Sequence, residues 1–227
     1  MKTLKAVLFD LDGTVTDSAE IVSEAMQAML YSRTGIMRPI DSFYKYLGPP
    51  LSESFQDMGA KPEETAAWLE DYRTRYLKKM PLTPLFPGIK ELLAQLQSYG
   101  FALGVATSKN TKYAKEVCDY TDVSQYFTEI YGASEDDKRS TKALVVESAL
   151  AGFTQKEILQ PEALLSPDGF RDDVVMVGDR IHDIEGAGAH HLRTILVGWG
   201  KAPQTERNLA WKVVETPAEL QELLFKM

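Results

Sequence analysis

Runs of consecutive apolar residues recur along the chain, at residues 6–9, 101–106, 174–177 and 194–197, and a further strand is expected near residues 129–132. Such runs are typical of strands buried on both faces of a parallel sheet. Between them, apolar residues return every three or four positions, as on one face of a helix. The clearest of these helical stripes lie at residues 89–96, 142–150 and 217–225. This alternation predicts an α/β fold with a doubly wound, Rossmann-like parallel sheet.

A long stretch without any strand pattern interrupts the alternation after the first strand. Asp17 and Glu20 form a candidate capping box before an amphipathic helix that Gly35 ends. Residues 41–47 predict a second, short helix, and a long third helix opens at residue 62 and runs to residue 76. We therefore expect a purely helical insertion at this point of the chain.

The insertion divides the chain into two predicted domains. An α/β core domain comprises residues 1–16 and 84–227, and a small helical cap domain comprises residues 17–83. If the cap moves against the core, the hinges are expected where the chain crosses between them, at residues 16–17 and 83–84.

Composition excludes several classes of function. A formal net charge of −8 argues against a general nucleic-acid binder, because no basic stripe is available to neutralise phosphates. Cys118 is the only cysteine, which rules out an intrachain disulfide and a cysteine-rich zinc site, and we interpret it as a packing residue. No segment approaches the length of a membrane span or a signal peptide. We expect a cytoplasmic protein that binds neither nucleic acid nor membrane.

The segment FDLDGTVTDS at residues 9–18, where the first strand ends, contains the main candidates for catalytic and metal-binding residues. Residues two apart in an extended chain point the same way, so Asp10 and Asp12 can face one reacting group, one attacking while the other moves a proton. Two adjacent carboxylates attract a cation, and oxygen ligands suit Mg²⁺. Gly13 permits a tight turn, and Thr14 offers a hydroxyl and an amide to an anion. The alternative is an acidic turn in which Asp12 merely caps a helix.

Three further polar clusters fall at strand ends or helix starts. Thr107 and Ser108 can hold a phosphate or serve as an ordinary N-cap. Lys142, in the first turn of a predicted helix, can neutralise a phosphate oxygen and Asp10, or be solvated surface; Lys138 is its rival.

The third cluster follows the strand at residues 174–177. Asp179 suits a hard-cation ligand, and Asp183, one helical turn later, suits a supporting hydrogen bond. The alternative is a capped helix start. His182, His190 and His191 have neither a catalytic-triad order nor zinc-site spacing and are interpreted as structural.

Taken together, these clusters resemble the haloacid dehalogenase-like hydrolase superfamily over nearly the whole chain. The sequence is most similar to its phosphoglycolate phosphatase-like branch, through the segment at 9–18, a helical cap in the first insertion point, LGPPL at 47–51, FPG at 86–88 and GDxxxD at 178–183. The stretch at residues 159–172 is longer than in the usual pattern and is expected to be a surface elaboration or a partner contact.

The resemblance implies the roles of the site residues. Asp10 would be the nucleophile that forms an aspartyl-phosphate, and Asp12 the general acid and then base. The phosphate would be held by Thr107, the Ser108 amide and Lys142. Mg²⁺ would be bound by the Asp10 side chain, the Asp12 backbone carbonyl and Asp179, with Gly13, Thr14 and Asp183 supporting the site.

These roles predict a Mg²⁺-dependent phosphatase acting on a small phosphorylated metabolite, of the phosphoglycolate or nucleotide type, in a monomer or homodimer. A dehalogenase would not be expected to carry the second acid, so Asp12 favours phosphate chemistry. A phosphosugar mutase and a non-catalytic phosphate-binding protein are the alternatives. Substrate specificity is expected to come from the cap, with these candidates: Tyr44, Lys45, Tyr46, Gly48 and Pro49.

Overall fold

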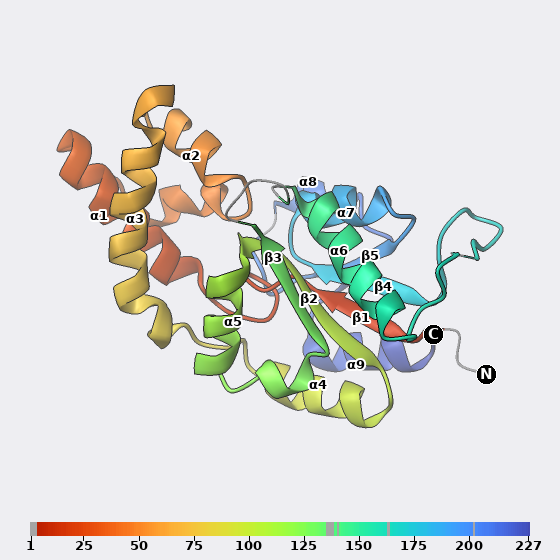
Figure 1. Ribbon diagram of the computed structural model, residues 1–227. Coiled ribbons are helices and arrows are strands. Elements are labelled where there is room, and N and C mark those ends of the chain that lie inside the picture. The colour runs from red at the N-terminus through yellow and green to blue at the C-terminus, as the bar shows by residue number, and fades with distance from the viewer. Residues whose placement is uncertain (1–3, 135–138, 140, 163, 202) are drawn as a thin grey trace.

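The computed structural model describes residues 4–134, 139, 141–162, 164–201 and 203–227. Its strands form one sheet of six parallel strands in the order β3-β2-β1-β4-β5-β6 (Figure 1). The strands are β1 Ala6–Phe9, β2 Ala102–Asn110, β3 Glu129–Ala133, β4 Val174–Gly178, β5 Arg193–Val197 and β6 Lys212–Val214. The strand order reverses at β1, so the carboxyl ends of β1, β2 and β4 flank the point where α/β sheets bind ligands.

Helices cover both faces of this sheet. In Figure 1, α4 and α9 lie below the strands, and α6 and α7 lie above them. The helices of this part of the chain are α4 Ile89–Ser98, α5 Thr111–Tyr120, α6 Lys142–Gln155, α7 Ile181–Gly188, α8 Gln204–Arg207 and α9 Pro217–Phe225, with a 3₁₀ turn at Ser124–Tyr126. The expected doubly wound α/β fold is confirmed.

Two apolar cores explain why the strands are apolar throughout. Val7 and Phe9 of β1 belong to the larger core, which includes α4, α5 and α9. Ala6 and Leu8 face the opposite way, into a smaller core beneath α6 and α7. Both faces of β1 are therefore buried, and this strand is anchored next to its terminal Asp10.

The helical segment between β1 and α4 stands apart from the sheet, at the left of Figure 1. It contains α1 Ala19–Thr34, α2 Leu51–Asp57 and α3 Thr65–Lys79, and 3₁₀ turns at Ile40–Tyr46, Pro62–Glu64 and Met80–Leu82. Residues 17–83 contain no strand, as expected. The division into cap and core domains remains a prediction, and we use the term helical segment for residues 17–83 of the structure.

The two connections of the helical segment run side by side. Thr16 and Leu85 form an antiparallel bridge, and the Asp17 amide donates to the Pro84 carbonyl at 2.9 Å. Both predicted hinges therefore lie in one short two-stranded ribbon beneath the helical segment. The expected capping box is wrong, because the N-cap of α1 is Ser18 and its side chain makes no capping hydrogen bond.

The stretch at residues 159–172 loops back onto β5. Leu165 and Arg171 form an isolated bridge, and the Arg193 guanidinium pairs with Asp168 at 2.7 Å and Asp172 at 2.6 Å. These contacts fasten the described part of the loop to the sheet. No described helix is both long enough and apolar enough to cross a bilayer.

Candidate active site

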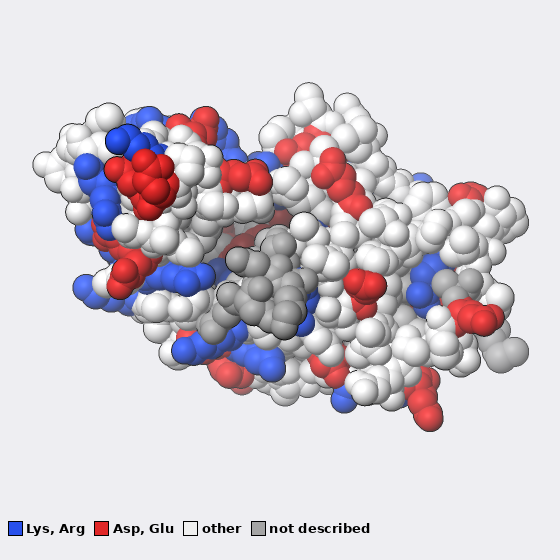
Figure 2. Space-filling model, turned by 45° about the horizontal axis from the view of Figure 1, so that its top comes forward, with Lys and Arg blue, Asp and Glu red and all other residues white. Residues whose placement is uncertain are grey.

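A cavity of about 540 Å³ lies between the helical segment and the carboxyl ends of the strands. Figure 2 looks toward the hollow that separates these two parts, and acidic side chains are visible inside it. Both parts line the cavity. The sheet-bearing part supplies residues that include Asp10, Asp12, Thr107, Ser108, Lys142, Asp179 and Asp183. Four of the predicted clusters, distant in sequence, thus meet in one place.

Asp10 and Lys142 form the buried centre of the cavity. Asp10 follows directly after β1, and Lys142 is the first residue of α6, whose N-cap Thr141 accepts a hydrogen bond from the Leu144 amide. The Lys142 Nζ lies 2.7 Å from Asp10 Oδ1 and 3.0 Å from the Ala106 carbonyl oxygen. Lys138, the rival to Lys142, lies outside the described residues.

Burial affects the pKa values of both residues of this pair. It raises the pKa of Asp10 to about 6, against the opposing effect of the Lys142 ammonium. Burial also disfavours the charged form of Lys142, but the carboxylates of Asp10 and Asp183 outweigh it and raise the lysine pKa. The ammonium is therefore a permanent positive charge beside Asp10, and a further cation would favour the Asp10 carboxylate.

Three buried carboxylates gather at this centre. One oxygen from each of Asp10, Asp179 and Asp183 lies within 4.8 Å of the others. Burial raises the pKa of Asp179 well above its ordinary value, and the charges of Asp183 and Asp10 raise it further. Asp179 Oδ1 is buried and accepts no hydrogen bond from any described residue. An unpartnered carboxylate oxygen in an acidic cluster fits a divalent cation such as Mg²⁺.

Asp183 is engaged differently from the other two. Its Oδ2 accepts hydrogen bonds from the backbone amides of Asp179 and Arg180, each at 3.0 Å, and its Oδ1 lies 2.8 Å from Lys142 Nζ. Oδ2 therefore has hydrogen-bond partners, whereas Oδ1 accepts no hydrogen bond from a described residue and has the Lys142 ammonium as its charged neighbour. This arrangement suits the predicted role of a residue that orients Asp179 and Lys142 rather than a direct ligand.

We expect Asp183→Asn to weaken Mg²⁺ binding by about 10- to 100-fold, because the amide orients Asp179 and Lys142 less well. Isothermal titration of the protein with Mg²⁺ measures this directly. Asp173→Asn, which removes a carboxylate paired with Arg171, is the matched control and should leave the affinity unchanged. Unchanged affinity in Asp183→Asn would contradict the orienting role.

Asp12 lies at the edge of the cavity and has a partner that the sequence analysis missed. Its Oδ2 is 2.8 Å from Lys109 Nζ, and its Oδ1 is 3.5 Å from the Thr16 hydroxyl. Lys109 belongs to β2 but also donates to the phenol oxygen of Tyr76, on α3 of the helical segment, at 2.9 Å. Burial opposes the charged form of Lys109, yet Asp12 and the two tyrosines beside it raise its pKa.

Lys109 lies in a part of β2 that continues beyond the apolar run to Asn110, with an irregular register between Ala106 and Asn110. All four residues of this extension line the cavity, so strand alternation alone does not single out Lys109. Thr107 is 2% exposed, and its hydroxyl accepts from the Lys109 amide at 3.3 Å. Ser108 also lines the cavity but is exposed. The expectation that the strand ends at Ala106 was wrong, because the polar residues 107–110 remain in the sheet.

Gly13 and Thr14 differ in their relation to the cavity. Gly13 has φ +83°, and a Cβ at this position would lie 2.3 Å from Asp179 Oδ2, so glycine allows Asp179 to approach the turn. Thr14 is fully buried and does not line the cavity. Its amide contacts the Leu11 carbonyl, and its own carbonyl accepts from Trp199 Nε1 at 2.9 Å. The Thr14 hydroxyl has no hydrogen-bond partner among the described residues, but it is buried outside the cavity lining, so its expected contact with an anion stays a prediction.

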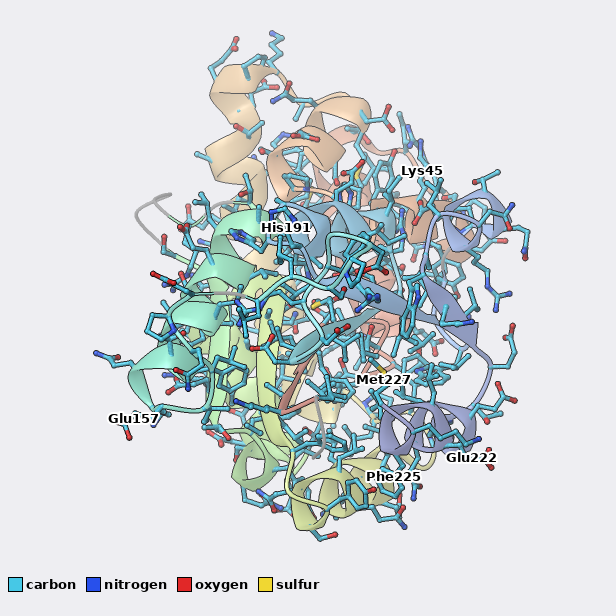
Figure 3. All side chains as sticks on the ribbon, turned by 90° about the vertical axis from the view of Figure 1, so that its right-hand side faces the viewer. Lys45, Glu157, His191, Glu222, Phe225 and Met227 are labelled. Atoms are coloured by element: carbon cyan, nitrogen blue, oxygen red, sulfur yellow. The ribbon has the colours of Figure 1, made fainter. Side chains whose placement is uncertain are left out.

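The candidate specificity residues differ in whether they line the cavity. Tyr46, Gly48 and Pro49 line the cavity, whereas Tyr44 and Lys45 do not. Lys45 is exposed and forms an ion pair with Asp57 at 2.8 Å, within the helical segment in the upper part of Figure 3. Lys45 is thus engaged within the helical segment, whereas the Tyr44 ring lies 5.3 Å from the Nζ of Lys201, which lines the cavity.

The helical segment lines the cavity with apolar and aromatic residues and also with polar ones, among them Arg73. The apolar and aromatic residues include Val22, Met26, Phe55, Leu69, Tyr72 and Tyr76. Apolar residues that face a protein core and apolar residues that line a cavity have the same helical spacing, so the sequence pattern could not distinguish these two roles.

Arg180 is a second residue that the sequence analysis passed over. Its guanidinium donates to the carbonyl of Leu47 in the helical segment and pairs with Glu206 at 3.1 Å. It thus joins the helical segment to the sheet-bearing part at the cavity wall. Two of the histidines bond to backbone carbonyls: His190 Nε2 lies 2.9 Å from the Ala143 oxygen and His191 Nδ1 3.1 Å from the Gly169 oxygen.

Comparison with known proteins places this site in a family. A family model described as haloacid dehalogenase-like hydrolase matches residues 7–197. The chain is 39% identical over 199 residues to tyrosine-protein kinase PtkA of Mycobacterium tuberculosis, covering 86% of this chain and 62% of PtkA. It therefore spans less than two thirds of that relative. It is also 33% identical over 205 residues to a 5'-nucleotidase of Pseudomonas aeruginosa, covering 88% and 85% of the two chains.

Solved structures agree. A predicted phosphatase from Clostridium acetobutylicum superposes with a TM-score of 0.85 at 33% identity, over 99% of each chain. Proteins named phosphoglycolate phosphatase are among the further matches. With its six-stranded parallel sheet, its acidic strand ends and these similarities, the chain belongs to the haloacid dehalogenase-like hydrolase family.

Proposed function

We propose that this protein is a Mg²⁺-dependent phosphatase that hydrolyses a small phosphomonoester through an aspartyl-phosphate on Asp10. The observation that carries the proposal is the pairing of two carboxylates in one cavity, with Asp10 held by Lys142 and Asp12 held by Lys109. Asp10 is buried in a site with a permanent positive charge, whereas Asp12 is more exposed. The two acids therefore have environments suited to two different tasks.

The first half-reaction uses both acids. An Asp10 carboxylate oxygen attacks phosphorus, the bond to the ester oxygen breaks, and Asp12 gives its proton to the departing alkoxide. The negative charge on the phosphoryl oxygens is offset by the Lys142 ammonium, and Thr107 offers its hydroxyl at the same wall of the cavity. The products of this step are the free alcohol and the phosphorylated Asp10.

The second half-reaction regenerates the protein. Asp12, now a carboxylate, takes a proton from water, and the resulting hydroxide attacks phosphorus and displaces Asp10. Inorganic phosphate leaves. Asp12 is thus protonated again, and both acids have returned to their initial states.

Asp10, Asp179 and the backbone carbonyl of Asp12 would hold Mg²⁺, with Asp183 supporting them. The bound cation supplies charge neutralisation for Asp10 and the phosphoryl oxygens. The unpartnered Asp179 Oδ1 supports this assignment, because a buried carboxylate oxygen without a donor is costly unless a cation binds it.

The cavity favours nucleoside monophosphates over phosphoglycolate within this class. Its wall on the helical segment includes the apolar and aromatic residues Phe55, Leu69 and Tyr72, which suit a planar base, beside polar residues such as Arg73. The similarity to a 5'-nucleotidase supports the same choice. The helical segment would then act as a cap that covers the leaving group and excludes water.

Phosphate release from a panel of phosphomonoesters tests the proposal. We expect Mg²⁺-dependent release from a nucleoside monophosphate, with loss of at least about 100-fold in chelator, because the Asp10 and Asp179 charges are then uncompensated. The panel should also contain phosphoglycolate and hexose phosphates. No release from any ester, with and without Mg²⁺, would sink the phosphatase proposal.

A phosphosugar mutase is distinguishable in the same assay. It would show a phosphorylated Asp10 that hydrolyses slowly, and activity that depends on a sugar bisphosphate. Intact-mass measurement of the protein after incubation with each ester detects the phosphorylated form.

A further inference from the structure

Lys109 occupies an unusual position between the proposed proton-transfer residue and the helical segment. Its side chain is only 9% exposed, and its Nζ lies 2.8 Å from Asp12 Oδ2 and 2.9 Å from the Tyr76 phenol oxygen. The same nitrogen is 4.6 Å from the centroid of the Tyr76 ring. A buried ammonium is costly unless it is paired, and these two residues provide that pairing.

Tyr76 is itself fixed by an aromatic row within the helical segment. Its ring stacks on Tyr72 at 5.7 Å between centroids, with an angle of 12° between the planes. Tyr72 packs against Phe55 at 5.9 Å, and Phe55 packs against Trp68. Tyr72 and Tyr76 are both almost fully buried. The phenol oxygen that holds Lys109 therefore belongs to a rigid part of α2 and α3.

The two contacts of the Asp12 carboxylate are unequal. Oδ2 receives the charged donor Lys109 at 2.8 Å, whereas Oδ1 has only a long 3.5 Å contact from the Thr16 hydroxyl. A proton on Oδ2 would meet the ammonium, so the transferable proton belongs on Oδ1. Lys109 thus fixes both the rotation of the carboxyl group and the oxygen that carries the proton.

We propose that Lys109 is a positioning residue that holds Asp12 in its proton-transfer orientation and, through Tyr76, makes that orientation depend on the helical segment. The proposal rests on the proposed function of Asp12 as acid and base. When the helical segment is seated as in this structure, Tyr76 and Asp12 share Lys109. When the segment moves away, Lys109 loses the Tyr76 contact and Asp12 is less well fixed. Proton transfer is thereby tied to the covered state of the cavity.

The test compares two substrates that differ in their need for a proton. An alkoxide is a strong base and needs protonation as it leaves, whereas p-nitrophenolate leaves without it. The wild-type protein, Lys109→Met and Tyr76→Phe are assayed with an alkyl phosphomonoester and with p-nitrophenyl phosphate. Lys115→Met, which alters an exposed lysine of α5 outside the cavity lining, is the matched control.

We expect Lys109→Met to lower kcat/KM, which reports the first half-reaction alone, by about 100-fold for the alkyl ester and by less than about fivefold for p-nitrophenyl phosphate. Hydrolysis of the phosphorylated Asp10 is common to both esters, so a fall in kcat from that step is shared by them. Tyr76→Phe removes one oxygen and should lower kcat/KM for the alkyl ester by about fivefold, with little effect on kcat/KM for the aryl ester. Lys115→Met should match the wild-type protein with both substrates.

Other outcomes overturn the assignment. Equal losses of kcat/KM on both esters in Lys109→Met would show that Lys109 binds substrate or stabilises the fold instead. Thermal denaturation of each variant shows whether a loss of activity comes from a folding defect. If Lys109→Met does not fold, the two esters are compared with Tyr76→Phe instead. If Tyr76→Phe has wild-type activity with both esters, the proposed dependence of the Asp12 orientation on the helical segment is wrong. A wild-type protein that hydrolyses neither ester would refute the proposed function, and this inference with it.

Discussion

Replacing Asp10 with asparagine should lower phosphate release by about 10⁴-fold or more, the largest loss expected of any single substitution in this chain. The amide has no negative oxygen with which to attack phosphorus. It keeps the shape of the side chain, and its oxygen can still accept the hydrogen bond that Lys142 now gives to Asp10 Oδ1. The loss is therefore expected in kcat. Steady-state release of phosphate from the best ester of the panel measures it.

The fold of Asp10→Asn should remain intact. Burial raises the pKa of Asp10 to about 6, which means that the native site disfavours its charge, so a neutral amide should not lower the melting temperature. Asp168→Asn, which removes an exposed carboxylate paired with Arg193, is the matched control and should retain full activity. Activity in Asp10→Asn within about tenfold of wild type would refute Asp10 as the nucleophile.

Replacing Lys142 with methionine should lower phosphate release by about 10³-fold and also destabilise the protein. The ammonium lies 2.7 Å from Asp10 and 2.8 Å from Asp183, and methionine leaves these buried carboxylates without a positive partner. Removing one partner of a buried ion pair costs about 3 kcal/mol of unfolding free energy. The loss of activity comes from the missing charge beside the phosphoryl oxygens. Urea denaturation in chelator measures the stability.

The stability loss should depend on pH. A carboxyl whose pKa is raised by folding binds a proton more tightly in the native state, so its destabilising effect is absent at low pH and grows as pH rises through the raised pKa. Asp10 already has a raised pKa of about 6 with Lys142 present. The difference between Lys142→Met and wild type should therefore be larger at about pH 8 than at about pH 5.

Lys156→Met is the matched control for this variant. Lys156 caps the other end of α6, is half exposed, and pairs only loosely with Glu129 at 3.4 Å. We expect wild-type activity and a change in unfolding free energy below about 0.5 kcal/mol. Equal effects of the two substitutions would show that Lys142 acts through helix α6 and not through its charge.

The elements that the sequence predicted well share one property, which is that local pattern and tertiary burial agree. β1 is apolar at every position because both of its faces are covered, and α9 was predicted at residues 217–225, where it lies. The helix α2 and the edge strand β6 were missed. Both are short, and Lys212 and Val213 of β6 are exposed, so neither has a periodic apolar pattern.

The residues of the candidate site also divide into those that the sequence predicted correctly and those that it did not. Asp10, Asp12, Asp179 and Asp183 were identified because polar residues at the carboxyl ends of parallel strands converge wherever the sheet order reverses. Tyr44 and Lys45 were chosen for their nearness in sequence to the GPP loop, and neither of them lines the cavity. Nearness in sequence does not determine which side of a 3₁₀ turn faces a neighbour.

Local periodicity and the general geometry of parallel sheets were enough to predict five of the six strands, the helical insertion and the acidic strand ends. The pairing of Lys109 with Asp12 and with Tyr76 could not be predicted in this way, because these contacts join residues 33 positions and more apart across two parts of the molecule. Side-chain partners of this kind depend on how a helix is seated against a strand, and no local pattern encodes that placement.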